Sequence, residues 1–314
     1  MVTVAGILFV MQANAGSSSE LFFCLHPMSS TLKFCLAACY LLISGCSMNQ
    51  LVAHSTRGLI DVGVRSMNEE NDLELARAAL PANLKLTESL IVELPRDRGL
   101  RMAAAEGFYG YAYGFVEDEQ PERAGRLYKR GLDHALAGLA LAGGGTHILE
   151  ASPDELAERV KTLGRQAVPE LFWAASNWAK WIDLNRTDPA RIADLPKTAR
   201  LMERVLELDP GYYFGGPHVF FGVYYGGRPA MLGGDFVKSA LHFDQAAAQA
   251  KHRWLLTEVL RAQYLLRQMG DRPAFHERLS AVLAAEDWPV EMSLANEIAR
   301  AKARRLLSQE EDLF

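Results

Sequence analysis

One stretch of the chain concentrates side chains that could contact a ligand. Residues 209–250 read DPGYYFGGPHVFFGVYYGGRPAMLGGDFVKSALHFDQAAAQA, and half of the fourteen positions from Tyr212 to Tyr225 are aromatic. A dense aromatic set with a few polar groups is typical of a small-molecule cavity. We expect an apolar wall and a smaller group of oriented polar side chains; the wall candidates are Trp173, Tyr212, Tyr213, Phe221 and Tyr225, and the polar candidates are Asn177, His218, Arg228 and Asp235.

Arg228 is the candidate anion contact of this set. A guanidinium group can grip a carboxylate with two hydrogen bonds, so Arg228 would suit an organic anion. The alternative is that Arg228 pairs with Asp235 and only fixes the glycine-rich loop between them. Each aromatic residue could likewise be ordinary core rather than cavity wall.

Catalytic patterns are missing from the sequence. It has no His-Glu-x-x-His, no paired cysteine motif and no Gly-x-Ser-x-Gly. His218 and His242 could approach each other, but a histidine among aromatic residues is more often a hydrogen-bonded packing residue. The acidic run Glu117-Asp118-Glu119 is most simply a solvated turn, and Ser239 falls on a packing position. We therefore predict a protein that is not an enzyme and holds no metal or cofactor.

The elements that would position these side chains are helices. Glycine doublets interrupt the central stretch, and glycine favours breaks over helix interiors. Pro217 suits a first helical turn, so we predict a helix over 217–225. Asp235 is a predicted N-cap for a second helix over 236–250. The spacing places His218, Phe221, Gly222 and Tyr225 on one face, where Gly222 should pack against another helix.

Helical patterning covers the rest of the body. Apolar residues recur every three or four positions from Leu73 to Ile91, with Pro81 as a boundary or kink. Ser152 and Glu155 have the spacing of a capping box, and further helices are expected over 122–141, 171–184, 189–208, 254–269, 272–286 and 292–308. No convincing alternating strand is present. The predicted class is all-α.

Two helix pairs resemble the tetratricopeptide repeat. That pattern places small and aromatic residues so that paired helices approach closely and an aromatic side chain fills the groove. Gly110 and Tyr113 with Ala124, Tyr128 and Gly131 match it, as do Gly222 and Tyr225 with Ser239, Phe243 and Ala246. Irregular spacing makes this a degenerate tetratricopeptide-like helical repeat array in one domain; the alternative is a plain α-helical bundle.

The N-terminal region reads as a targeting segment. The chain has 314 residues and a net charge of −5, with no basic patch that suggests nucleic acid. All four cysteines lie in the first 46 residues, and the apolar run Phe34–Ile43 precedes Ser44-Gly45-Cys46. This order is typical of a secretory signal, since the run is too short to span a bilayer. Met28 is a more plausible start than Met1, so residues 1–27 are suspected of being a mis-assigned start.

Residues 43–46 resemble the bacterial lipobox, in which the cysteine becomes the lipidated first residue. The resemblance implies a signal peptide region over 1–45 and lipidation at Cys46. The polar residues that follow are expected to form a tether over 46–57, and the helical patterning predicts a repeat domain over 58–314. Ser47 resembles the sorting signal for the outer membrane. We therefore expect a lipid-anchored protein on the periplasmic side of a bacterial membrane, and the sequence leaves a homo-oligomer open.

The lipobox, the helical repeats and the central stretch together resemble the T component of TRAP transporters, the tripartite ATP-independent periplasmic systems. The matching residues run from Pro217-His218-Val219-Phe220-Phe221-Gly222 through Arg228-Pro229 and Leu232-Gly233-Gly234-Asp235 to His242-Phe243. The resemblance implies a periplasmic helical lipoprotein that contacts the transporter's solute-binding (P) protein and has a ligand-accessible cavity or pore. Organic acids are the cargo it implies. The alternative is a structural docking scaffold for envelope proteins, with no ligand of its own.

Overall fold

Short sequence signals set the beginnings of several helices. Asp97 and Asp235 each lie directly before a helix and accept a hydrogen bond from a backbone N–H group of its first turn. Ser152 and Glu155 form a reciprocal capping box. Because these side-chain oxygens satisfy N–H groups that have no partner inside the helix, they stabilise its first turn. The predicted helix starts at Ser152 and Asp235 are confirmed.

The computed structural model describes residues 53, 55–185 and 187–314, which belong to one compact unit, Gln50–Phe314. The predicted signal region 1–45, Cys46 and most of the 46–57 tether lie outside the described residues. Residues 55–68 are helical. The helices that follow are α3 (Leu73–Glu93), α4 (Arg98–Phe115), α5 (Pro121–Leu139), α6 (Pro153–Lys161), α7 (Val168–Asp183), α8 (Pro189–Ile192), α9 (Leu195–Leu208), α10 (Tyr212–Gly226), α11 (Phe236–Gln249), α12 (Leu256–Arg261), α13 (Arg267–Met269), α14 (Arg272–Ala284), α15 (Ser293–Ser308) and α16 (Glu310–Leu313).

Short π and 3-10 turns complete the described part of the chain, in which no strand occurs. They are η1 (Ala140–Gly144), η2 (Arg165–Ala167), η3 (Ala230–Leu232), η4 (Ala262–Leu266) and η5 (Val290–Met292). The all-α prediction is confirmed for these residues. The tetratricopeptide character of the helix pairs stays a prediction. No helix among the described residues is long and apolar enough to cross a membrane.

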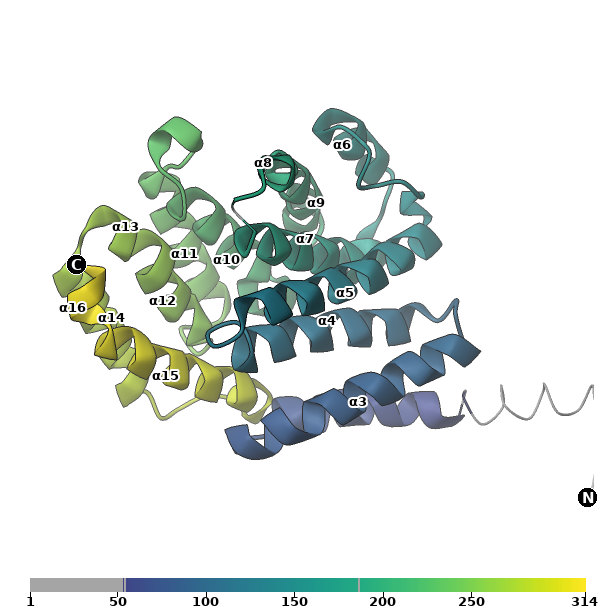
Figure 1. Cartoon of the computed structure of the whole chain (residues 1–314), viewed down its shortest axis with the longest axis horizontal. Coiled ribbons are helices and arrows are strands. Elements are labelled where there is room, and N and C mark those ends of the chain that lie inside the picture. The colour runs from purple at the N-terminus through teal and green to yellow at the C-terminus, as the bar shows by residue number, and fades with distance from the viewer. Residues whose placement is uncertain (1–52, 54, 186) are drawn as a thin grey trace, which may run out of the picture. The chain divides into compact units, whose positions relative to one another are not determined.

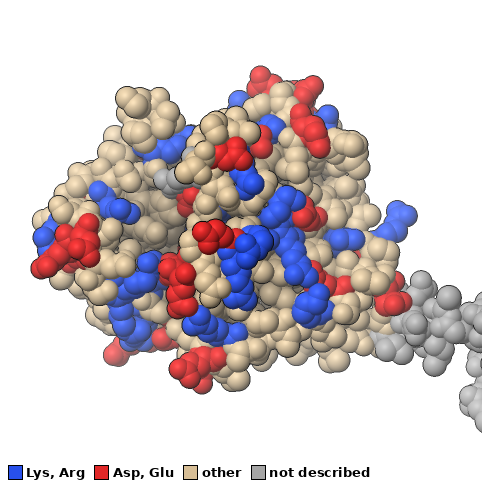
Figure 2. Space-filling view, in the orientation of Figure 1, with Lys and Arg blue, Asp and Glu red and all other residues tan. Residues whose placement is uncertain are grey.

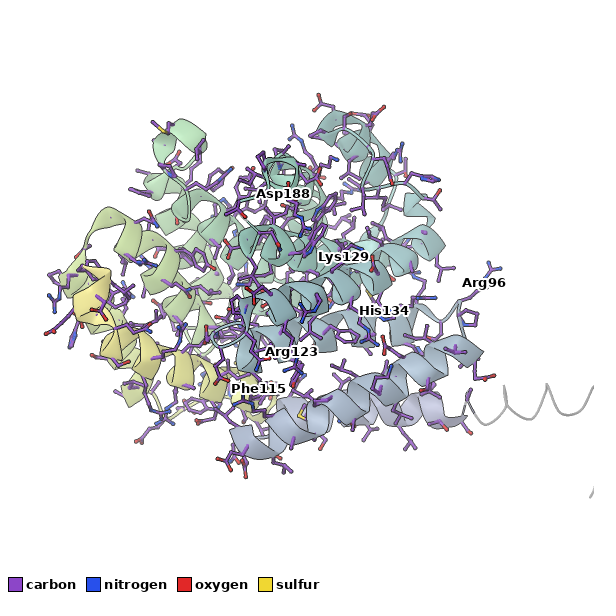
Figure 3. All side chains as sticks on the ribbon, viewed as in Figure 1. Arg96, Phe115, Arg123, Lys129, His134 and Asp188 are labelled. Carbon is purple, nitrogen blue, oxygen red and sulfur yellow. The ribbon has the colours of Figure 1, made fainter. Side chains whose placement is uncertain are left out.

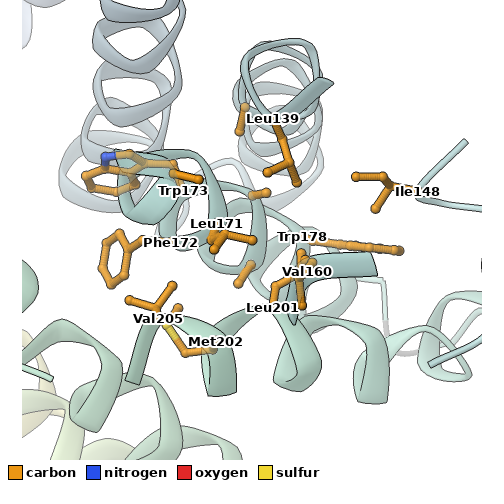
Figure 4. Packing of buried hydrophobic residues seen from close by; sticks show 14 of the residues in the cluster. Leu139, Ile148, Val160, Leu171, Phe172, Trp173, Trp178, Leu201, Met202 and Val205 are labelled. Carbon is orange, nitrogen blue, oxygen red and sulfur yellow. The ribbon is translucent and has the colours of Figure 1, made fainter. Parts of the chain in front are cut away.

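Consecutive helices pack in antiparallel layers, as Figure 1 shows for α3, α4, α5 and α7. Helix α7 is the centre of the largest core cluster. Phe172, Trp173 and Trp178 on α7 are buried among side chains of α5, α6 and α9, as seen in Figure 4. Polar side chains of α5, labelled in Figure 3, contact rings of the neighbouring helices: Arg123 lies over Tyr111 and His134 stacks on Phe108, both on α4, and Lys129 lies over Trp181 on α7. Figure 2 shows acidic and basic groups interspersed on this side of the molecule.

The two ends of the array meet. Helix α15 packs against α3, beside which it lies in Figure 1. Gly114 on α4 leaves room for Ile298 on α15, since an added Cβ would lie 2.7 Å from the Ile298 Cδ1 atom. Lys302 Nζ lies 3.0 Å from Asp118 Oδ2, and Arg305 adds a second ion pair to Asp118. The helices therefore close around a central space.

The contact predicted for Gly222 is confirmed. A Cβ at this position would lie 2.8 Å from Cε1 of Phe243, a fully buried ring on α11. The hydroxyl group of Ser239, also on α11, donates to the Gly222 carbonyl oxygen at 2.7 Å. Because Gly222 has no side chain, α10 and α11 approach closely enough to make both contacts.

Helix α10 begins earlier than predicted, with a turn of the opposite hand. Tyr213 (φ 49°), Phe214 (φ 59°) and Gly215 (φ 79°) are all left-handed, and the right-handed helix follows them. Glycine adopts this conformation freely, but each of the other two residues costs about 1–2 kcal/mol. The turn places the Phe214 ring in a stack with Trp254, with centroids 4.4 Å apart, and the Tyr213 ring against Trp173.

Candidate ligand cavity

The central space contains a cavity of about 450 Å³, which we call the main cavity. Helices α4, α7, α10 and α12 supply most of its wall, together with residues from the η3 and η4 turns. Its volume lies within the range of small-molecule sites. Most of its lining is apolar or aromatic; the aromatic members are Tyr109, Tyr113, Phe172, Trp173, Tyr213, Phe220, Tyr224, Trp254 and Tyr264.

Three of the nine residues proposed from the sequence line the main cavity. They are Trp173 on α7, Tyr213 in the left-handed turn and Arg228 directly after α10. Tyr212 packs edge-on against Phe172, with centroids 5.1 Å apart, behind the wall. Phe221 and Tyr225 face α11 and lie within stacking distance of His242.

Asn177 is completely buried and bonded to the backbone. Its Nδ2 group donates to the carbonyl oxygens of Ala105 at 3.2 Å and Trp173 at 2.9 Å. A Cβ at Gly131 would lie 2.4 Å from the Asn177 side-chain oxygen. Asn177 therefore joins α4, α5 and α7 where they cross, beside the lining of the cavity.

His218 and His242 form a pair between α10 and α11. Their Nδ1 atoms lie 3.0 Å apart, so one must donate and the other accept. Burial lowers the pKa of both imidazoles, and the neighbouring His218 lowers that of His242 further, to about 4. The two rings are therefore neutral near pH 7. Within the described part of the chain, no group of three His, Cys, Asp or Glu residues is close enough to hold a metal.

Arg228 and Asp235 bind different partners. Arg228 Nε donates to the Tyr224 carbonyl oxygen at 2.8 Å, and its guanidinium lies 3.8 Å from the centre of the Tyr224 ring. Asp235 caps α11 and lies 3.3 Å from Lys238 Nζ. The pair between Arg228 and Asp235 that we considered is not formed. Among the described residues no carboxylate neutralises Arg228, which lines the cavity.

Lys180 and Asp183 on α7 form a second polar region of the wall. Lys180 Nζ lies 2.8 Å from Glu117 and 3.7 Å from Asp183, so Glu117 is enclosed by an ion pair and the expectation of a solvated turn is wrong for this residue. The Tyr264 hydroxyl donates to Asp183 at 3.0 Å. Although burial opposes the charged forms, the attraction between them lowers the pKa of Glu117 and raises that of Lys180. Because Lys180 is already paired, Arg228 is the better contact for an incoming anion.

Several lining residues were not proposed from the sequence. Tyr109 and Tyr113 come from α4, Lys180 from α7, and Trp254 and Tyr264 from beyond α11. Trp254 follows 209–250 by only four positions, but the others lie well outside this stretch, so only the tertiary packing joins them to it. One usable signal was the helix face that carries Glu106, Tyr109 and Tyr113, which are three and four positions apart.

Comparison with known proteins supports one family. A family model described as TRAP transporter T-component matches residues 69–314. A protein of Treponema pallidum (strain Nichols), described as an uncharacterized protein, is 25% identical over 320 aligned positions, which cover 92% of this chain and 99% of that protein. The family match spans the cavity helices α4, α7, α10 and α12.

Proposed function

Because the chain belongs to the TRAP transporter T-component family, we propose that it receives a small, partly apolar organic anion in the main cavity and contacts the transporter's solute-binding protein. The family consists of transporter components rather than enzymes, and membership suggests a periplasm-associated protein. Lipidation at Cys46 would tether the helical domain to the membrane, with the outer membrane as the proposed location.

Arg228 carries the ligand proposal. It is a guanidinium group on the wall of an otherwise mostly apolar cavity, with no carboxylate partner among the described residues. A ligand carboxylate would supply the missing negative charge, and its apolar part would displace water from the aromatic wall. Charge-assisted hydrogen bonds of this kind are stronger than neutral ones.

The cavity rim carries the partner proposal. Leu232 lines the cavity and is also exposed to solvent; Met231 directly before it is 88% exposed, and Val237, in the first turn of α11, is 81% exposed. Apolar side chains gathered on a surface often mark a protein contact. A solute-binding protein seated here would cover the cavity next to Leu232, so that a ligand could pass between the two proteins without crossing bulk water.

Ligand binding is tested by calorimetry with octanoate and with octanol as its uncharged counterpart. The unaltered protein should bind octanoate more tightly, and Arg228→Ala should remove most of this preference. Arg191→Ala is a matched control, because Arg191 also lies over an aromatic ring, Trp181, but is paired with Asp188. Unchanged octanoate binding by a folded Arg228→Ala variant would reject the anion contact.

Partner binding is tested with the solute-binding protein immobilised on a surface. Val237→Asp should weaken its capture of the full-length protein, whereas Val92→Asp should not. Val92 is a suitable control because it is 76% exposed and lies on α3, away from the rim. Partner binding without any ligand binding would favour the docking scaffold instead.

A further inference from the structure

A second cavity of about 250 Å³ adjoins the main cavity, and we call it the small cavity. Helix 55–68, α3, α4 and α15 supply much of its wall. The two cavities share a set of aromatic residues, which we call the aromatic partition: Tyr109, Tyr113, Trp173, Tyr213 and Trp254. The small cavity is therefore bounded on one side by rings and elsewhere mainly by aliphatic side chains.

Glu106 is an ionisable group on the wall of the small cavity. It lies on α4, one turn before Tyr109. Its carboxylate accepts a hydrogen bond from the Tyr213 hydroxyl at 3.1 Å. Among the residues that the structure describes, no lysine, arginine or histidine forms an ion pair with it.

This lack of a counter-charge sets Glu106 apart from other enclosed carboxylates. Glu117 lies against Lys180 and Lys302, Glu170 lies against Arg98, and Glu88 against Arg130. Burial without a cation raises the pKa of Glu106 to about 7, and the hydrogen bond from Tyr213 offsets only part of this effect. A positively charged ligand would supply the missing partner.

The rings beside Glu106 favour an organic cation. Tyr213 packs against both Trp173 and Trp254 at an interplanar angle of 79°, and all three side chains line both cavities. Aromatic faces attract ammonium groups within about 6 Å of the ring centre, and quaternary ammonium ligands are commonly bound this way. A Ca²⁺ or Mg²⁺ ion would need several oxygen ligands, which one carboxylate and one hydroxyl do not provide.

We propose that Glu106 and the aromatic partition form a binding site for an organic ammonium group. The carboxylate neutralises the positive charge, and the rings and aliphatic wall surround its alkyl substituents. This site is independent of Arg228 and of the anion proposed for the main cavity, so either can exist without the other.

The test uses choline and dimethylbutanol, an uncharged isostere in which carbon replaces the nitrogen. Trp173 and Trp254 lie in the aromatic partition, so tryptophan fluorescence of the full-length protein can report binding. At about pH 8 we expect choline to bind saturably and at least roughly tenfold more tightly than dimethylbutanol. A contact with a buried charge changes the binding affinity by about this factor.

Two variants locate the site. Glu106→Gln keeps an acceptor for Tyr213 but removes the charge, and should weaken choline binding at least roughly tenfold. Glu291→Gln is the control, because Glu291 borders the same cavity but is exposed to solvent, and it should bind choline normally. Equal binding of choline and dimethylbutanol by the unaltered protein, no choline binding, or full binding by Glu106→Gln would each overturn the proposal.

Discussion

Replacing Glu106 by glutamine should stabilise the protein above neutral pH. Glutamine has nearly the same shape and can still accept the hydrogen bond that Tyr213 donates at 3.1 Å. It removes a charge that burial disfavours. The pKa of Glu106 rises from 4.5 to about 7 on folding. A pKa change of this size corresponds to roughly 3 kcal/mol, at 1.36 kcal/mol for each tenfold change in equilibrium constant.

The sign follows from the protons bound in each state. Below about pH 4.5 the carboxyl is protonated in both the folded and the unfolded protein, so burial of the charge has no effect. Between 4.5 and 7 the unfolded state releases its proton first, and the free energy of unfolding falls as the pH rises. Above 7 both states are ionised and the full cost is present. Because Glu106 lines a cavity and is only partly shielded from solvent, screening reduces this cost, and we expect a gain of about 1–3 kcal/mol.

Urea unfolding, followed by far-ultraviolet circular dichroism, measures this gain. The midpoint for Glu106→Gln should exceed that of the unaltered protein at about pH 8, and the two should coincide near pH 4.5. Glu291→Gln, which alters an exposed carboxylate, should show no such difference. A Glu106→Gln variant that is equally or less stable at both pH values would refute the reasoning that this carboxylate is buried without a counter-charge.

Other predictions concern packing, ion pairs and the anchor. Gly222→Ala should lower the free energy of unfolding by about 1–3 kcal/mol, because the new Cβ would lie 2.8 Å from Phe243; an unchanged urea midpoint would contradict this. Glu117→Gln should lower the free energy of unfolding by about 3 kcal/mol in the same assay, because Lys180 and Lys302 lose their shared partner. A gain in stability would be inconsistent with that pairing. Cys46→Ser should release the protein from membranes on fractionation; persistent attachment, or an unmodified Cys46 by mass spectrometry, would count against lipidation.

Features determined by neighbours in the chain were predictable from the sequence. The capping box at Ser152, the cap at Asp235 and the exposed or buried faces of the long helices depend on residues three or four positions apart. The close approach at Gly222 also follows from such a pattern, because a glycine between aromatic residues on one face leaves room for a partner side chain. For these features the interacting groups are visible together in the sequence.

The cavity wall was only partly predictable, because it depends on which distant helices meet. Trp173, Tyr213 and Arg228 were identified, but an aromatic residue in core and an aromatic residue in a cavity wall have the same local pattern. Phe221 and Tyr225 show the ambiguity, since they share the composition of the wall yet face α11. The role of Glu106 is not predictable from the sequence, because it depends on the absence of a nearby cation in the folded structure.

Unfavourable local structure also occurs at and beside the aromatic partition. Tyr213 and Phe214 adopt left-handed conformations, and Glu106 is held beside them without a counter-charge. Unfavourable backbone conformations of this kind persist only when the surrounding structure imposes them, and they cluster at functional sites. A helix beginning regularly before Pro217 would avoid the strain but would not carry the Tyr213 ring to its position between the two cavities. The strain therefore supports a ligand site at the partition on grounds that are independent of family membership.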